Sequence, residues 1–198
     1  MVDVDLGAVR EDQVAAFSED ELLDLDEEFA LRSELVARLG TLPHRAFFGC
    51  VAACLTDIRR AYGAGLSGEG LILVERSLAA ARAAADGRPV RDEAAELWAD
   101  WCAYMKFDPN ADSPTGDDAE PVPTEVVNDL QGPCAVVAWA LADAGRRYEA
   151  AEAIARSAES YVDWDFSGAH VRLLLCFIAR ANEARASHTA NHSANHTA

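Results

Sequence analysis

Apolar residues spaced three and four positions apart constrain the fold of this chain more than any other feature. The clearest case lies between positions 47 and 62, where one face collects Phe47, Cys50, Val51, Cys54, Leu55, Ile58 and Tyr62. Residues at this spacing share one side of an α-helix, so the pattern predicts an amphipathic helix packed on a core. Alanine is abundant and no strand-like alternation is found, which favours an all-α fold.

Helix start and stop signals predict a single domain, a bundle of about six to seven helices over residues 18–185. Ser18, followed three positions later by Glu21, predicts a capping box at the start of the first helix. We expect residues 1–17 to form a flexible acidic arm. The tail, residues 186–198, repeats His, Asn, Thr and Ala, and we expect it to be disordered because it has little apolar surface to bury.

The acidic charge of the chain is concentrated in two segments. The formal net charge is −17; residues 1–39 hold 12 acidic and 3 basic residues, and residues 107–125 hold 6 acidic residues and no basic one. The second segment overlaps a proline-rich interhelical loop, 107–123. Localised charge can define a binding surface. The acidic balance argues against nucleic acid and anionic membranes as partners, because both would be repelled.

One face of the first expected helix combines this charge with an apolar side chain. On a helical wheel, four carboxylates surround one leucine; the five positions are Asp20, Asp24, Glu27, Leu31 and Glu34. An exposed Leu31 rimmed by carboxylates would anchor a partner, and the charge would guide a basic protein to it. The alternative is a solvated helix face on which Leu31 touches a neighbouring element.

The expected location of the protein is the cytoplasm. The first ten residues lack the basic and apolar segments of a signal peptide, and the longest apolar run, 134–142, is too short to span a bilayer. The five cysteines all lie in apolar stretches: Cys50, Cys54, Cys102, Cys134 and Cys176. We expect them to be reduced, buried thiols that pack as small hydrophobic side chains.

Two patterns approach ligand-binding motifs without meeting their requirements. Gly63, Gly65 and Gly68 have the spacing of a dinucleotide-binding loop, but that loop must follow a strand, and here a helix is expected before it. Cys50 and Cys54 lie one helical turn apart and could supply two zinc ligands, but no second pair completes a site. A flexible interhelical loop and a core face are the expected alternatives.

Histidine recurs every four residues in the tail, as His188, His192 and His196. If the tail were helical, the three imidazoles would align and could bind a transition metal. The intervening Thr, Ser and Asn residues are weak helix formers, so we expect only adventitious metal affinity. No pattern in the chain predicts a resident metal or a cofactor.

A second hypothesis places a ligand pocket or an active site among aromatic residues and a histidine. Trp98 and Trp101 share one face of an expected helix. His170 lies in the first turn of the last expected helix, where Asp163 or Asp165 could pair with it and let it act as a base. The alternatives are a packed aromatic core and a structural histidine, and no motif positions a nucleophile.

The stretch from Glu34 to Cys54, continued to Tyr62, has a leucine-rich helix end, a short linker and a helix with Ala and Cys before its aromatic end. In this pattern the chain resembles the YjaG-like family, a bacterial all-helical family of unknown function. The segments 133–141 and 150–155 look like the Ala-rich central helices of that family. The acidic arm and the proline-rich loop depart from it. The resemblance implies an all-helical fold and a bacterial cytoplasmic setting, and it implies no catalytic residues.

The charge pattern favours a non-enzymatic protein-interaction domain that binds a basic protein through the acidic helix face. Small helical immunity proteins of bacterial toxin systems are broadly similar in composition. The alternative is a small-ligand-binding protein or an enzyme with a pocket lined by Trp and His. A third interpretation is a structural domain whose acidity keeps it soluble. The sequence carries no signal for an oligomeric state.

Overall fold

The computed structural model describes residues 4–24, 28–62, 68–105, 130–159 and 169–196, and the structural statements below concern these ranges. Side chains at several helix ends, including those of 191–196, lie outside the described set. The described ranges contain α-helices and no strand, which confirms the all-α prediction. In the same ranges, no helix is both long enough and apolar enough to cross a membrane.

The α-helices in chain order are α1 (Glu11–Ala16), α2 (Glu19–Asp24), α3 (Glu28–Thr41), α4 (His44–Tyr62), α5 (Gly68–Ala85), α6 (Arg91–Tyr104), α8 (Gly132–Ala142), α9 (Arg147–Glu159) and α10 (Ala169–His196). A 3₁₀ turn, η3 (Ala144–Arg146), leads into α9. The nine α-helices described exceed the six to seven expected, because α1 is additional and the first expected helix is described as α2 and α3.

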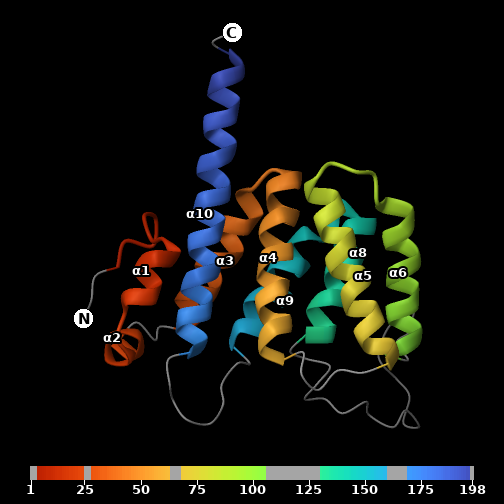
Figure 1. The fold of residues 1–198 in the computed structure, drawn as a ribbon, viewed down its shortest axis with the longest axis horizontal. Coiled ribbons are helices and arrows are strands. Elements are labelled where there is room, and N and C mark those ends of the chain that lie inside the picture. The colour runs from red at the N-terminus through yellow and green to blue at the C-terminus, as the bar shows by residue number, and fades with distance from the viewer. Residues whose placement is uncertain (1–3, 25–27, 63–67, 106–129, 160–168, 197–198) are drawn as a thin grey trace.

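The helices form an elongated bundle with α1, α2 and α10 at one end and α5, α6 and α8 at the other (Figure 1). The helix α8 packs against α5, α6 and α9, and seven of its eleven residues are buried. A helix that is apolar on all sides needs such a central position, as its sequence predicted. The largest fully buried side chains include Trp101, Phe47, Phe48 and Phe177, so one core extends along the bundle.

The cysteines are free thiols, and four of the five are buried, as predicted. Cys50 and Cys54 both lie on the face of α4 that packs into the core. Burial raises the pKa of Cys54 and of Cys134, so these thiols stay protonated and pack as small hydrophobic groups.

The N-terminal segment, residues 4–17, packs against α10 and is not the loose arm that we expected. Val9 and Val14 are 2% and 0% exposed and belong to the core. The guanidinium of Arg172 on α10 donates to the backbone oxygens of Val14 and Phe17, at 3.2 and 3.0 Å. Apolar residues dispersed among the acidic ones give this segment enough surface to bury, which the charge count overlooked.

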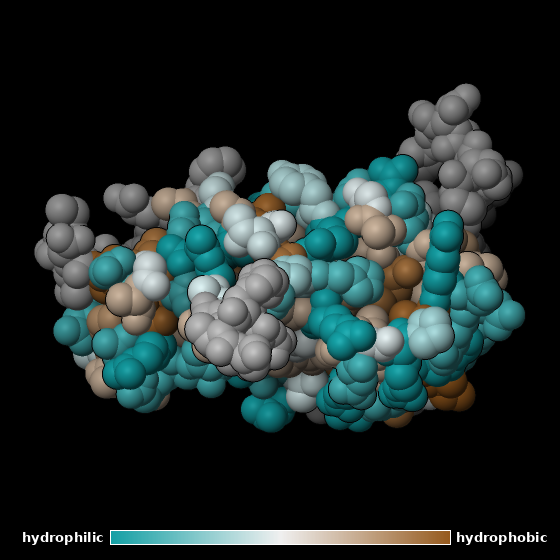
Figure 2. Space-filling view, turned by 90° about the horizontal axis from the view of Figure 1, so that it is seen from above, coloured by the Kyte–Doolittle hydropathy of each residue, from teal (hydrophilic) through white to brown (hydrophobic). Residues whose placement is uncertain are grey.

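The C-terminal tail is helical and is not the disordered segment that we expected. The helix α10 continues to His196 and projects beyond the rest of the bundle (Figure 1). Residues 185–190 on this projection are exposed. Extending a helix that packing has already nucleated avoids the unfavourable first turn, so weak helix formers can follow it. Figure 2 shows the molecule from above, the side toward which α10 projects. This side has mainly hydrophilic residues, with hydrophobic residues scattered between them.

Candidate interaction surface

The acidic face predicted from the helical wheel is not a single surface in the described residues. Leu31 is 3% exposed and lies in the core, so its predicted role as an exposed anchor is wrong. The helix α3 packs against both α9 and α10, and its apolar side is therefore wider than the wheel implied. Asp20 is exposed on α2, whereas the side chain of Asp24 and the whole of Glu27 lie outside the described residues.

The charged side chains described on α3 form ion pairs. Glu34 Oε1 lies 2.5 Å from an Nη atom of Arg38, one turn along the helix. Arg32 Nη2 lies 2.8 Å from Glu152 Oε2 on α9, and this hydrogen bond lowers the pKa of Glu152. These positive partners reduce the negative potential that α3 was expected to present.

The start of α2 has the predicted capping box. The backbone N–H of Ser18 donates to Glu21 Oε2 at 2.9 Å, and the backbone N–H of Glu21 donates to Ser18 Oγ at 3.3 Å. The Ser18 hydroxyl also donates to the Glu21 carboxylate, at 2.8 Å. The hydrogen bond from the backbone of Ser18 lowers the pKa of Glu21, so this carboxylate is ionised at neutral pH.

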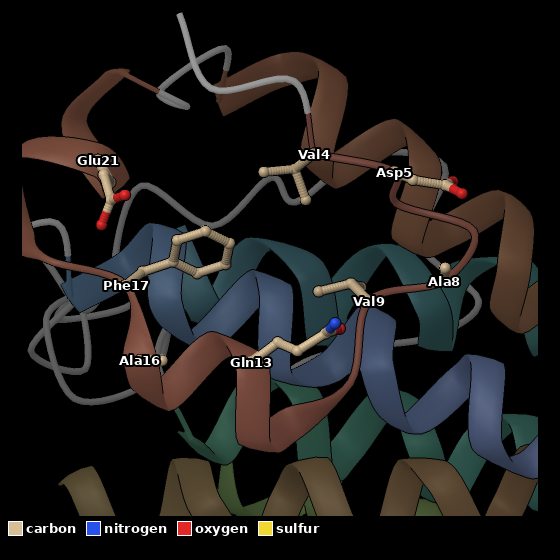
Figure 3. Close-up of a pocket in the computed structure, with 8 residues that line it drawn as sticks. All are labelled: Val4, Asp5, Ala8, Val9, Gln13, Ala16, Phe17 and Glu21. Atoms are coloured by element: carbon tan, nitrogen blue, oxygen red, sulfur yellow. The ribbon is translucent and has the colours of Figure 1, made fainter.

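A pocket of about 460 Å³, here called the N-terminal pocket, opens between residues 4–17 and the start of α2 (Figure 3). It is lined by Val4, Asp5, Ala8, Val9, Gln13, Ala16, Phe17 and Glu21. The side chains of Val4, Val9 and Phe17 point into the space, and Gln13 reaches along its floor from α1. The Glu21 carboxylate lies at one end, and that of Asp5 at the opposite rim, turned outward.

Among the described residues, the lining of the N-terminal pocket is mainly apolar and acidic, with two carboxylates and no basic side chain. Asp5 Oδ1 accepts a hydrogen bond from the backbone N–H of Gly7 at 2.8 Å, which orients this carboxylate at the rim. Glu21 is oriented by the capping box. Both negative charges are therefore held in place, and the pocket combines a fixed negative rim with apolar walls.

Three side chains of α10 hold the segment that forms the pocket. Besides Arg172, the amide of Asn182 donates to the backbone oxygens of Leu6 and Val9, at 3.0 and 3.2 Å. The guanidinium of Arg180 pairs with Glu11 on α1 and, at 2.5 Å, with Asp57 on α4. These contacts attach the segment that forms the pocket to the packed helices of the domain.

The tryptophans of the second hypothesis do not line a common site with His170. Trp101 is fully buried, and its indole N–H donates to Ser77 Oγ at 3.0 Å, so this ring is part of the core. Trp98 is half-buried and stacks on Trp139 with 5.3 Å between ring centroids. The guanidinium of Arg146 covers Trp139, 4.3 Å from the centroid of the ring.

His170 is buried on α10, which lies at the other end of the bundle from α6 (Figure 1). The structure therefore does not bring it together with Trp98 and Trp101. Asp163 and Asp165, its candidate partners, lie outside the described residues.

The remaining motif-like patterns show no ligand site in the residues that the structure describes. A helix, α4, precedes the glycine cluster as expected; Gly68 begins α5, and Gly63 and Gly65 lie outside the described residues. Among the side chains that the structure describes, no group of three or more His, Cys, Asp or Glu residues is arranged to hold a metal ion. That finding does not extend to His192 and His196, whose side chains are not described.

No family model matches the chain, and neither does any curated protein or solved structure.

Proposed function

We propose that the chain is a non-enzymatic protein-interaction domain that binds a basic protein through its N-terminal pocket. The observation that supports this proposal is a pocket whose described lining has apolar walls, two oriented carboxylates and no basic side chain. The aliphatic stem of a lysine or arginine can pack on Val4, Val9 and Phe17 while its charged end meets a carboxylate at the rim. A neutral side chain would gain less from that rim, and an acidic one would be repelled by it.

The charge around the pocket supports a basic partner. Residues 4–24 contain seven acidic residues and one basic residue, Arg10. Arg10 Nε lies 3.5 Å from Asp12 Oδ1. Asp5 and Asp20 are exposed. A surface of one sign raises the association rate of an oppositely charged protein by about 10-fold to 1,000-fold, and salt screens the effect. We therefore expect fast, salt-sensitive association.

An immunity-type protein that masks a basic toxin is one form that such a domain can take. A bacterial cytoplasmic setting, which the resemblance to the YjaG-like family implies, is compatible with it. In this proposal the domain acts by occupying its partner's basic surface, so it needs no catalytic residue.

The first experiment tests the carboxylates with a matched pair of variants. Asp5→Asn with Asp20→Asn removes one charge at the pocket rim and one exposed charge on α2, next in sequence to the pocket residue Glu21, and it leaves the capping box in place. Glu93→Gln with Glu96→Gln removes two exposed charges on α6, at the other end of the bundle. Affinity capture from cells of the native source is carried out with each variant and with the unchanged protein. We expect the unchanged protein and the α6 variant to recover the same basic proteins. The pocket variant should recover less of them.

The association rate of a recovered partner, measured at low and high salt, then separates steering from contact. We expect the pocket variant to associate about tenfold more slowly at low salt and to approach the unchanged protein at high salt. Equal rates for all three proteins, or equal losses for both variants, would contradict the proposed site.

The second experiment tests the apolar walls. Val4→Ser changes a half-buried residue of the pocket, and Ile72→Ser changes a residue of α5 that is 59% exposed. We expect Val4→Ser to increase the dissociation rate of the partner, because apolar contact mainly determines how long a complex lasts. Ile72→Ser should leave that rate unchanged. A partner that dissociates from both variants as it does from the unchanged protein would show that the pocket is not the contact.

A further inference from the structure

The projecting end of α10 carries a histidine at every fourth position. His188, His192 and His196 belong to a repeat of the form His-Thr/Ser-Ala-Asn that fills the last turns of the helix. The helical backbone is continuous from Ala169 to His196, and the part beyond the bundle is exposed where its side chains are described (Figure 1).

The helical backbone makes this spacing significant. Four residues advance an α-helix by about 6 Å and turn it by roughly 40° more than one full turn, so successive histidine positions lie above one another on one face. Two histidines four residues apart on a helix are the arrangement that binds zinc in helical metal sites. The repeat supplies two such pairs in succession, 188 with 192 and 192 with 196.

We propose that this histidine face of α10 is a binding site for a transition-metal ion of the Zn²⁺, Ni²⁺ or Cu²⁺ type. Imidazole nitrogens are suitable ligands for these ions, and a pair of them leaves the remaining coordination positions to water. His188 is exposed, as are its neighbours from Arg185 to Ala190, so an ion can reach the face from solvent. The residues between the histidines are Thr, Ser, Ala and Asn, so between them the repeat contains no aromatic or long charged side chain.

The site is independent of the N-terminal pocket in its chemistry. The packed part of α10 ends near Ala181 and Ala184, which are the last buried and half-buried positions before the exposed turns. Changes at 190 or 192 therefore leave the contacts of Arg172, Arg180 and Asn182 with the N-terminal segment in place.

The test separates helical spacing from histidine content. In the full-length chain, exchanging residues 190 and 192 (A190H with H192A) keeps three tail histidines but moves the middle one two residues toward the N-terminus. The histidines then lie two and six residues apart, and residues two apart do not face each other on a helix. His44→Ala is the matched control, because His44 is also exposed but lies at the start of α4.

Titration with Zn²⁺ and with Ni²⁺, followed by calorimetry, gives the affinities. We expect the unchanged chain and the His44→Ala variant to bind equally, and the exchanged variant to bind at least about tenfold more weakly, because the second imidazole no longer benefits from a high effective concentration. Binding should also slow amide hydrogen exchange in residues 186–196 of the unchanged chain and not of the exchanged variant. Equal affinity in the exchanged variant, no binding to the unchanged chain, or loss of binding in His44→Ala would each overturn the proposal.

Discussion

Asn182 on α10 should hold the N-terminal segment in place, and its removal has a measurable consequence. Its amide nitrogen donates to the backbone oxygens of Leu6 and Val9, at 3.0 and 3.2 Å, and its amide oxygen accepts from Arg38 on α3. The side chain therefore joins three segments that lie far apart in the sequence. Asn182→Ala removes all three hydrogen bonds and leaves two backbone oxygens to be satisfied by water.

The size of the effect follows from the number and kind of these bonds. A neutral hydrogen bond contributes about 1 kcal/mol and one to a charged group about 1.5–3 kcal/mol, so the bonds together contribute about 3–5 kcal/mol. Asn182 is half-buried, so in the variant water can restore part of the stabilisation that these hydrogen bonds provide. Alanine is also a better helix former than asparagine by roughly half a kcal/mol. We expect Asn182→Ala to lower the free energy of unfolding by about 2–3 kcal/mol.

Urea unfolding measures the global loss, and amide hydrogen exchange shows where it arises. Residues 4–17 should exchange much faster in Asn182→Ala, whereas the core helices α4 and α8 should follow only the global change. Asn191→Ala is the matched control, since it makes the same substitution on the projecting part of α10. If the two variants have the same stability and the same exchange in residues 4–17, the anchoring role of Asn182 is refuted.

Three further predictions concern the core and the ion pairs. Leu31→Ala should destabilise the domain by about 2–4 kcal/mol in urea unfolding, because Leu31 is buried; a change below about 0.5 kcal/mol would instead indicate an exposed leucine. Trp101→Phe removes the indole that donates to Ser77 Oγ and should cost about 1–3 kcal/mol, measured in the same way, while Trp98→Phe should cost less because Trp98 is only half-buried. Arg32 lowers the pKa of Glu152 in the folded protein, so this pair stabilises the fold fully above the unfolded pKa of about 4.5 and loses its effect as the pH falls through the folded pKa. Glu152→Gln should therefore reduce stability by less than about 1 kcal/mol at neutral pH, since the pair is about a quarter exposed. The unfolding curves of the two proteins should converge as the pH falls below the lowered, folded-state pKa of Glu152.

Local patterns in the sequence predicted the parts of the fold that local physics determines. The periodicity of α4, the uniformly apolar α8 and the capping box of Ser18 with Glu21 each depend on residues within a few turns of one another. The buried cysteines followed from the apolar stretches around them. These predictions needed no knowledge of which helices meet.

The predictions that failed depend on contacts between distant segments. Leu31 is buried because α9 and α10 cover both sides of α3, and nothing within α3 indicates this. The N-terminal pocket exists because α10 side chains more than 150 positions away bind the backbone of residues 4–17. The apolar residues Val9 and Val14 themselves were the available signal that the segment packs, and the density of acidic residues obscured it.

Anchoring the N-terminal segment changes what its charge can do. On a flexible arm, the carboxylates of residues 4–24 would sample many positions, and their attraction for a partner would have no fixed direction. Held by Arg172, Arg180 and Asn182, the segment places Asp5 and Glu21 at opposite ends of one apolar pocket. A partner then meets a preorganised surface and does not lose the conformational entropy of ordering the arm. Asn182→Ala should therefore weaken partner binding although Asn182 does not line the pocket, whereas changes that only add or remove distant charge should not.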